Sequence, residues 1–233
     1  SIEKDIDIGF SFWYDGIPFT KLTVCSNGWV SFLPCLNDGN ISDCSAIPYF
    51  YNHSITHPLG PYGMLAPFFD DLDDNSGNEP LNVYFWTNQL DSVIVEWDNV
   101  ANGQTDQNCP DCEKETFQII LDNSKISGTD NGKIIFQYKE IHDIDDHGST
   151  IGIESWEKNT GVEYLFNNEY ASDEYNLHDG LAIKFTPDIY GCINESACNF
   201  NQDATEDDGS CEYFDDCGVC SGFGLSCNIE PFY

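Results

Sequence analysis

Hydrophobic and polar positions alternate through most of the chain, and residues 61–100 show the pattern most clearly. An apolar run leads into the acidic segment 70–74, and two alternating segments follow it. In the second of these, Val93, Val95 and Trp97 share one face. A period of two is typical of a half-buried strand. This stretch therefore predicts a strand, an acidic loop and then a hairpin.

Similar alternation on either side of this stretch predicts further strands. Asn27 and Gly28 lie between two alternating segments and predict a tight hairpin, because both residues tolerate a positive φ angle. Apolar faces on both sides of a turn-rich connection predict a second hairpin over residues 115–139. Further strands are expected over 149–155, 161–166 and 180–185. About ten strands without a helical period predict an all-β fold, an antiparallel β-sandwich.

The composition changes near residue 190. The last six cysteines crowd into a final segment of about 40 residues, which is too short to bury a hydrophobic core of its own. We therefore expect two domains. The first is a β-sandwich over residues 1–189, and the second is a small disulfide-rich C-terminal module over residues 190–233, called the tail below.

The total of eleven cysteines is typical of a protein that folds in an oxidising, extracellular compartment. The tail cysteines are expected to form disulfides, with fifteen pairings open: Cys192, Cys198, Cys211, Cys217, Cys220 and Cys227. In the sandwich, Cys35 is close in sequence to Cys44, and Cys109 to Cys112, so two local disulfides are expected. Half a zinc site and a redox pair are the alternatives for Cys109 and Cys112. Cys25 is then left over, either as a buried thiol or bonded to the tail or to another subunit.

The chain is strongly acidic. Its 41 acidic residues outnumber 8 lysines, arginine is absent, and the net charge is -33. Arginine is the side chain that usually binds phosphate through paired hydrogen bonds. A chain that lacks arginine and is this negative is unsuited to nucleic acid, nucleotides or anionic membranes. No apolar run is long enough to cross a bilayer, and no signal peptide is visible. We expect a mature form of a secreted or cell-surface protein in salty surroundings.

Two acidic clusters contain candidate calcium ligands. The first comprises Asp70, Asp71, Asp73 and Asp74. The second, weaker one comprises Asp203, Asp207 and Asp208. Calcium binds about six to eight oxygen atoms, and closely spaced aspartates in loops supply them. Neither cluster has the EF-hand spacing, and solvated acidic loops are the alternative in so acidic a chain.

Other candidate sites are few. Three Asn-X-Ser sequons offer glycosylation sites, at Asn40, Asn52 and Asn194. His53 and His57 lack the glutamate of a zinc-protease motif and are expected at the surface. Glu96 and Glu154 would need to meet in a cleft to act as a glycosidase pair, and no nucleophile motif is present. We therefore expect no enzyme activity.

The order of the strand motifs resembles that of a known family. The chain contains, in succession, VCSNGWVSF, LAPFFDDLD, VIVEWDNV, FQIILDNSKISGTDNGKIIFQY, TIGIES and DGLAIKFTP. This succession is similar to the nidogen-type (NIDO-like) β-sandwich domains of secreted and cell-surface proteins, over about residues 5–187. The resemblance implies a non-enzymatic module of adhesive or matrix-like proteins. The long loop over residues 34–60 departs from it.

The tail resembles a short cysteine repeat of extracellular proteins of marine and environmental microbes. The repeat reads GC…ACN(Y/F)N…A…DDGSC. The matching positions are Gly191, Cys192, Ala197, Cys198, Asn199, Asn201, Ala204, Asp207, Asp208, Gly209, Ser210 and Cys211.

Two functions are consistent with these observations. The first is a structural or adhesive module that assembles into a homopolymeric filament, with the tail, apolar over residues 229–233, docking on a neighbouring sandwich. The alternative is a carbohydrate-binding adhesion domain that uses Trp13 and Trp156 as aromatic platforms, while core packing accounts for Trp86 and Trp97. Calcium is the only cofactor expected, and the partners are other copies, glycans or other surface proteins.

Overall fold

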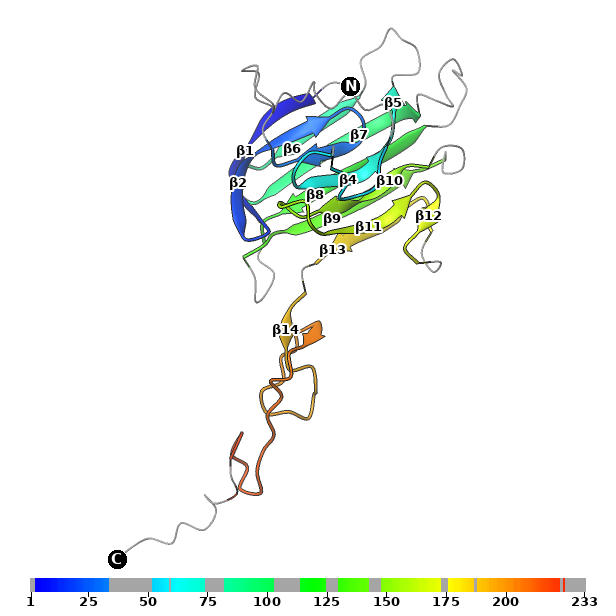
Figure 1. The fold of residues 1–233 in the computed structure, drawn as a ribbon. Helices are drawn as coiled ribbons and strands as arrows, with labels where there is room; N and C mark the ends of the chain where they lie inside the picture. Colours follow the sequence, from blue (N-terminus) through cyan, green and yellow to red (C-terminus); the bar gives the residue numbers. More distant parts are fainter. Residues whose placement is uncertain are drawn as a thin grey trace, which may run out of the picture. The chain divides into compact units, whose positions relative to one another are not determined.

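A computed structural model describes residues 3–33, 52–58, 60–73, 82–102, 114–124, 130–142, 148–172, 176–186, 188–222 and 224. Within these ranges the chain forms fifteen strands and no helix (Figure 1). Two compact units separate chiefly between Phe185 and Thr186, and each is described by itself. None of the described segments forms a helix that is long and apolar enough to cross a membrane.

The first sheet has seven antiparallel strands. Their spatial order is β1 (Glu3–Tyr14), β2 (Ile17–Cys25), β3 (Trp29–Ser31), β4 (Met64–Phe69), β10 (Thr150–Glu154), β11 (Gly161–Phe166) and β12 (Glu169–Tyr170). Strands β1 to β4 are consecutive in the chain, whereas β10 to β12 return from its second half to join β4 (Figure 1).

The second sheet is also antiparallel. Its order is β13 (Ala182–Phe185), β9 (Lys133–Glu140), β8 (Glu115–Asp122), β7 (Ser92–Asn102) and β5 (Leu72–Asp73), with β6 (Val83–Thr87) also paired to β7. The pairing of β8 with β9 confirms the hairpin predicted over residues 115–139.

One hydrophobic core contains residues of both sheets. Trp97 on β7 stacks on Phe117 of β8 with ring centroids 5.1 Å apart, and Phe68 of β4 lies 5.3 Å from the same ring. Two polar side chains also join the sheets, because Trp97 Nε1 donates to Cys25 O (3.1 Å) and Tyr138 OH donates to Pro67 O (2.7 Å). Burial raises the pKa of Tyr138 well above its ordinary value, so its hydroxyl stays a donor. This packing confirms the predicted β-sandwich.

The hairpin at Asn27 and Gly28 is confirmed, and it does more than reverse the chain. Cys25 pairs with Trp29 across the turn, and Gly28 adopts a φ of 78°. The turn also contacts the end of β4, because Phe68 N donates to Gly28 O and Asp70 N donates to Asn27 O, both at 3.3 Å. The tight turn is thereby fixed to the neighbouring strand.

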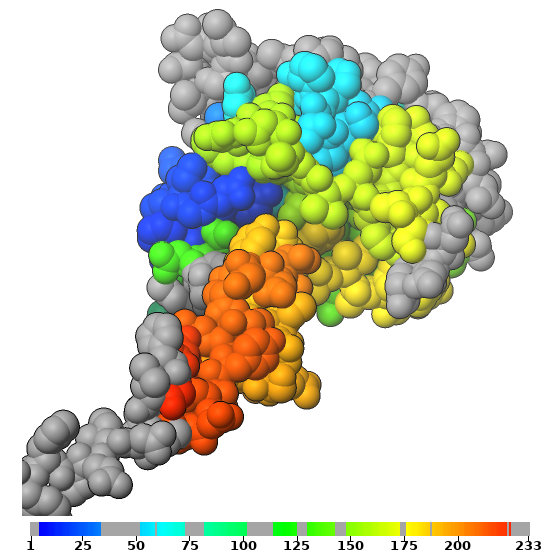
Figure 2. Space-filling model, turned by 60° about the horizontal axis from the view of Figure 1, so that its bottom comes forward, coloured from blue at the N-terminus to red at the C-terminus, as the bar shows by residue number. Residues whose placement is uncertain are grey.

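The tail has few buried side chains and relies on cross-links. A short strand, β14 (Tyr190–Gly191), pairs in parallel with β15 (Glu206–Asp207). Disulfides join Cys192 to Cys211 and Cys198 to Cys220, and Cys217 is disulfide-bonded as well. Figure 2 shows how slender the described part of this unit is, in orange to red, and most of its side chains are exposed. The predicted disulfide-rich module is confirmed.

Several predicted positions lie outside the described residues and stay predictions. These are Cys35, Cys44, Cys109, Cys112, Cys227, Asp74, Asn40 and residues 229–233.

Candidate binding face

The side of the second sheet that points away from the core carries two rows of side chains. The strand register aligns the first row as Trp86, Ile94, Ile120, Ile135 and Lys184. It aligns the second as Tyr84, Glu96, Gln118, Gln137 and Ala182. These ten residues are called the outer face. The first row is mostly apolar and the second mostly polar, so the face offers both kinds of contact to a partner.

Two aromatic side chains are exposed at one end of the outer face. Tyr84 and Trp86 are 54% and 53% exposed. Core packing was expected for Trp86 and Trp97; it is confirmed for Trp97, which is fully buried, and wrong for Trp86. The reason lies in β6, where Phe85 packs against the core, so its neighbours in the strand must face outward. Exposed Trp and Tyr are typical of protein interfaces and ligand platforms.

A shallow hollow lies along the second row of the outer face, and Glu96, which pairs with Tyr84, is part of its lining. It has a volume of about 280 Å³. Its walls are formed by Glu96, Thr116, Phe117, Gln118, Gln137, Tyr138, Lys139, Gly180, Leu181 and Ala182. Gln118 Nε2 donates to Gln137 Oε1 at 2.6 Å, which orients both amides. The hollow therefore presents a fixed amide pair within a lining that is more apolar than polar, and it is slightly smaller than a typical small-molecule pocket of about 300–1,000 Å³.

Lysines gather on the other end of the same side of the sheet. The outward positions of β9 and β13 are Lys133, Ile135, Gln137, Lys139, Ala182 and Lys184. Three of these six are lysines and none is acidic, although the whole chain has only 8 lysines against 41 acidic residues. We call Lys133, Lys139 and Lys184 the lysine edge. It is a locally basic surface on a strongly acidic chain.

The ion pairs of the lysine edge are weak. Lys133 Nζ lies 3.9 Å from Asp122, and Lys139 Nζ lies 3.6 Å from Glu140 at a site where both side chains are largely exposed. Exposed pairs of this kind contribute about 0–1 kcal/mol. These lysines therefore keep most of their capacity to bind a further carboxylate.

The tryptophans expected as platforms are less accessible than the aromatic pair on β6. Trp156 is half-buried, with its ring centroid 4.8 Å from Phe19 and 6.0 Å from Tyr62, and its backbone N–H donates to Asp15 (2.7 Å). Trp13 on β1 is half-buried too. The exposed pair on β6 is the better candidate for a platform, and sequence reasoning missed it.

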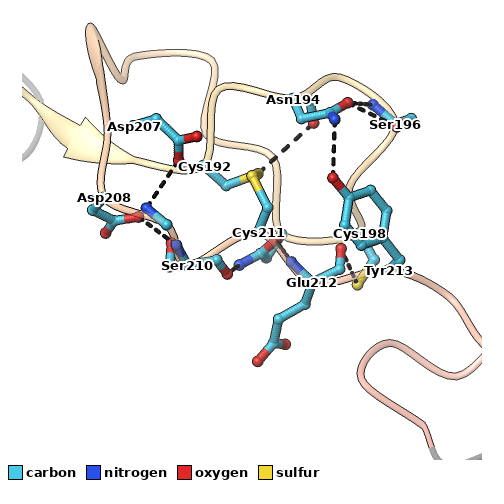
Figure 3. The surroundings of a disulfide bond; sticks show 12 residues. Cys192, Asn194, Ser196, Cys198, Asp207, Asp208, Ser210, Cys211, Glu212 and Tyr213 are labelled. Atoms are coloured by element: carbon cyan, nitrogen blue, oxygen red, sulfur yellow. Dashed lines mark hydrogen bonds between the residues drawn. A yellow bond between two sulfur atoms is a disulfide. The ribbon is translucent and has the colours of Figure 1, made fainter.

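The two candidate calcium clusters have different surroundings. Asp70 is 2% exposed at the end of β4, where its Oδ1 accepts from Asp71 N (2.8 Å), and Asp73 belongs to β5. In the tail, Asp207 Oδ1 accepts from Gly209 N (3.0 Å) and Asp208 Oδ1 accepts from Ser210 N (2.9 Å), as Figure 3 shows. Asp203 is exposed. Calcium binding stays a prediction for both clusters.

The spacing of polar residues in the tail has a structural reason. Asn199 donates through Nδ2 to Ser210 O (2.6 Å) and accepts through Oδ1 from Glu212 N (2.8 Å). Asn194 donates to the Tyr213 hydroxyl at 2.9 Å (Figure 3). These bonds, with those of Asp207 and Asp208, hold the loops around the disulfide between Cys192 and Cys211. Hydrogen bonds from Ser210 also lower the pKa of Asp208.

The loop that precedes β4 packs closely against the first sheet. Asn52 Nδ2 donates to Gly148 O and to Thr150 Oγ1 (3.2 Å), while glycosylation of this sequon stays a prediction, as it does for Asn194. His53 and His57 stack with ring centroids 4.7 Å apart. Both are half-buried, so the expectation that they lie at the surface is wrong. The two rings fold back on each other because the loop turns sharply between them.

Glu154 is a buried carboxyl that the sequence did not single out for its environment. Its side chain at the end of β10 is fully buried, and burial raises its pKa to about 7. Lys158 and the backbone amides of Thr56 and Met64 oppose this rise without cancelling it. Glu96 lies in the other sheet and faces outward. The two carboxyls therefore do not form a glycosidase pair.

An antiparallel sandwich followed by a disulfide-bonded module is typical of extracellular proteins. Comparison with protein families agrees with this class, because the family described as NIDO related matches residues 1–187. The chain belongs to the NIDO-related family, which confirms the resemblance in its strand motifs. No match was found among curated proteins or among solved structures. The family is one of non-enzymatic structural domains and indicates an extracellular module.

Proposed function

We propose that this protein is a structural and adhesive subunit that associates with other copies outside the cell to form a homopolymeric filament. One observation carries the proposal: the chain holds two different surfaces suited to binding, on two separate compact units. The outer face of the sandwich exposes Tyr84 and Trp86, and the tail exposes aromatic side chains of its own. Contacts between unlike surfaces of identical subunits propagate instead of closing into a dimer.

The tail surface is unusually apolar for so acidic a segment. Tyr190 and Phe214 are 66% and 61% exposed, and Phe200, Tyr213 and Val219 are exposed as well. Aromatic side chains of this kind contribute most of the binding energy in many protein interfaces. Burying them against a second subunit would remove them from water.

Carbohydrate binding is the second candidate, and the outer face favours it. Tyr84 lies in the same row as Glu96, Gln118 and Gln137. An aromatic ring beside carboxylate and amide groups suits a sugar, which has an apolar face and many hydroxyls. The shallowness of the hollow and the presence of exposed aromatic side chains on both the outer face and the tail make self-association the stronger proposal.

Deletion of residues 190–233 should leave a folded but monomeric sandwich, because the deletion removes one of the two surfaces and leaves the core intact. Sedimentation velocity and electron microscopy of the intact and shortened chains, in calcium and moderate salt, would measure assembly. Circular dichroism would check the fold and the proposed boundary at residue 190. A shortened chain that assembles as well as the intact one, or an intact chain that stays monomeric at high concentration, would contradict the proposal.

Calcium should bind to the acidic loop after β4 and stabilise the sandwich. At a calcium concentration one hundred times its dissociation constant, the gain is about 2.7 kcal/mol. Calorimetry after chelation would detect the binding heat, and thermal unfolding the shift. The double variant Asp71→Asn and Asp73→Asn should lose both signals, whereas Asp188→Asn, at an exposed aspartate outside both clusters, serves as a control. Absence of heat together with an unchanged melting point would exclude the site.

A further inference from the structure

The geometry points to a particular pair of surfaces for the self-association proposed above, on which this inference rests. We propose that the lysine edge and adjoining outer face of one copy bind the acidic, aromatic tail of a second copy. The occupant is thus a second copy of this chain, and the interface combines charge pairing with the packing of aromatic rings.

The first argument is the uneven distribution of charge. Residues 186–233 contain ten acidic residues and no lysine, so all 8 lysines belong to the rest of the chain. In the described part of the tail almost every acidic side chain is exposed. The remainder of the chain is itself acidic and repels the tail over most of its surface. Within the described part of the sandwich the lysine edge differs, since the outward positions of β9 and β13 hold three lysines and no carboxylate.

Charge complementarity of this kind determines register and orientation more than affinity. Opposite charges steer the encounter, and like charges elsewhere suppress wrong contacts. Lys139 and Lys184 are both exposed, and Lys184 forms no ion pair within the described part of the chain. Both can therefore reach carboxylates of a neighbouring tail without breaking a strong bond.

The second argument is the apolar surface beside these charges. The first row of the outer face runs from Trp86 through Ile94, Ile120 and Ile135 to Lys184. The tail presents exposed aromatic rings close in sequence to acidic residues, such as Phe214 beside Asp216. A ring packed on the isoleucines would bring its acidic neighbours to the lysines. Such an apolar centre with charges at its rim is the usual anatomy of a specific interface.

Charge-reversal variants of the full chain test this pairing. Lys184→Glu should weaken self-association roughly tenfold, and the double variant Lys139→Glu and Lys184→Glu roughly a hundredfold, because each places like charges together. The matched control is Lys21→Glu, an exposed lysine on β2 of the other sheet, which changes the net charge by the same amount as Lys184→Glu. It should weaken assembly by no more than about twofold. Sedimentation velocity at physiological salt would supply the association constants.

The decisive experiment mixes two weakened variants. The first is the double lysine variant, and the second carries Glu206→Lys and Asp216→Lys in the tail, where both side chains are exposed. Each alone should assemble poorly. In the mixture, the acidic edge of the first meets the basic tail of the second, and the native edge of the second meets the native tail of the first. Assembly should return to near the native level as an alternating polymer.

Several results would overturn the pairing. Equal weakening by Lys184→Glu and Lys21→Glu would reveal a general charge effect, and a mixture that stays dissociated would exclude this interface. If the native chain assembles but no charge variant matters, the filament stands and the surfaces are wrong. If the native chain is monomeric, and the double lysine variant is monomeric with a larger hydrodynamic radius, the tail binds its own sandwich. If it is monomeric and binds a glycan array in a manner lost with Trp86→Ser, the face recognises carbohydrate instead.

Discussion

Replacing Gly28 with alanine should lower the unfolding midpoint by roughly 10 °C. Gly28 has a φ of 78°, a region that costs other residues about 1–2 kcal/mol. An added Cβ would also lie 1.8 Å from the carbonyl oxygen of Phe68, which is backbone and cannot rotate away. Separating the turn from β4 to relieve this overlap adds about 1–3 kcal/mol and breaks the hydrogen bonds between them.

Gly16 supplies the matched control for this substitution. Its φ of 71° is similar, but no atom lies within 4 Å of an added Cβ. Gly16→Ala should therefore lose only the conformational part, about 1–2 kcal/mol, and lower the midpoint by a few degrees. Thermal unfolding of both variants under identical conditions measures the difference. Equal losses would mean that the contact between turn and β4 does not constrain the fold.

The pH dependence of stability should change when Glu154 is replaced by glutamine. The folded pKa of Glu154 is about 7, above the ordinary value of 4.5, because burial disfavours the ionised form. Between these two values the folded protein keeps a proton that the unfolded chain has released. The free energy of unfolding therefore falls as pH rises from about 4.5 to 7, and this loss persists above pH 7.

Thermal unfolding at pH 5 and pH 8 would measure this effect. Glu154→Gln, which cannot ionise, should be more stable than the native chain at pH 8 and gain little at pH 5. Glu96→Gln is the control, since it removes one carboxyl from the outer face of the other sheet, away from the buried site of Glu154. Parallel pH profiles for the native chain and Glu154→Gln would show that Glu154 ionises in the folded protein as it does in the unfolded chain.

Alternation along the sequence was sufficient to predict the sandwich, because the buried residues of β7, β8 and β9 recur at every second position. It failed at β6, whose sequence VYFWT contains three aromatic residues in succession. A period of two shows which side chains share a face but not which face is buried when both are apolar. Only the register with β7 shows that Phe85 points inward and Trp86 outward.

The candidate face was beyond sequence reasoning for a related reason. Lys139 and Lys184 are separated by more than forty residues and share no local motif. They lie on the same side of neighbouring strands because β13 pairs with β9, and a strand pairing of that range leaves no pattern in a single sequence. The cysteine pairing in the tail was open for the same reason, whereas the family could be recognised from the order of its strand motifs.

Because the tail depends on its disulfides, their formation decides when a copy can begin to polymerise under the proposed assembly. Each of its two fully described disulfides closes a loop of about twenty residues and contributes about 3 kcal/mol, in a unit with little buried surface. In the reducing interior of a cell such disulfides do not persist, whereas the sandwich is held by a large hydrophobic core. The tail can therefore fold only where its disulfides can form. On the assembly proposed above, newly made chains remain single until they leave the cell, and growth begins only where the filament is needed.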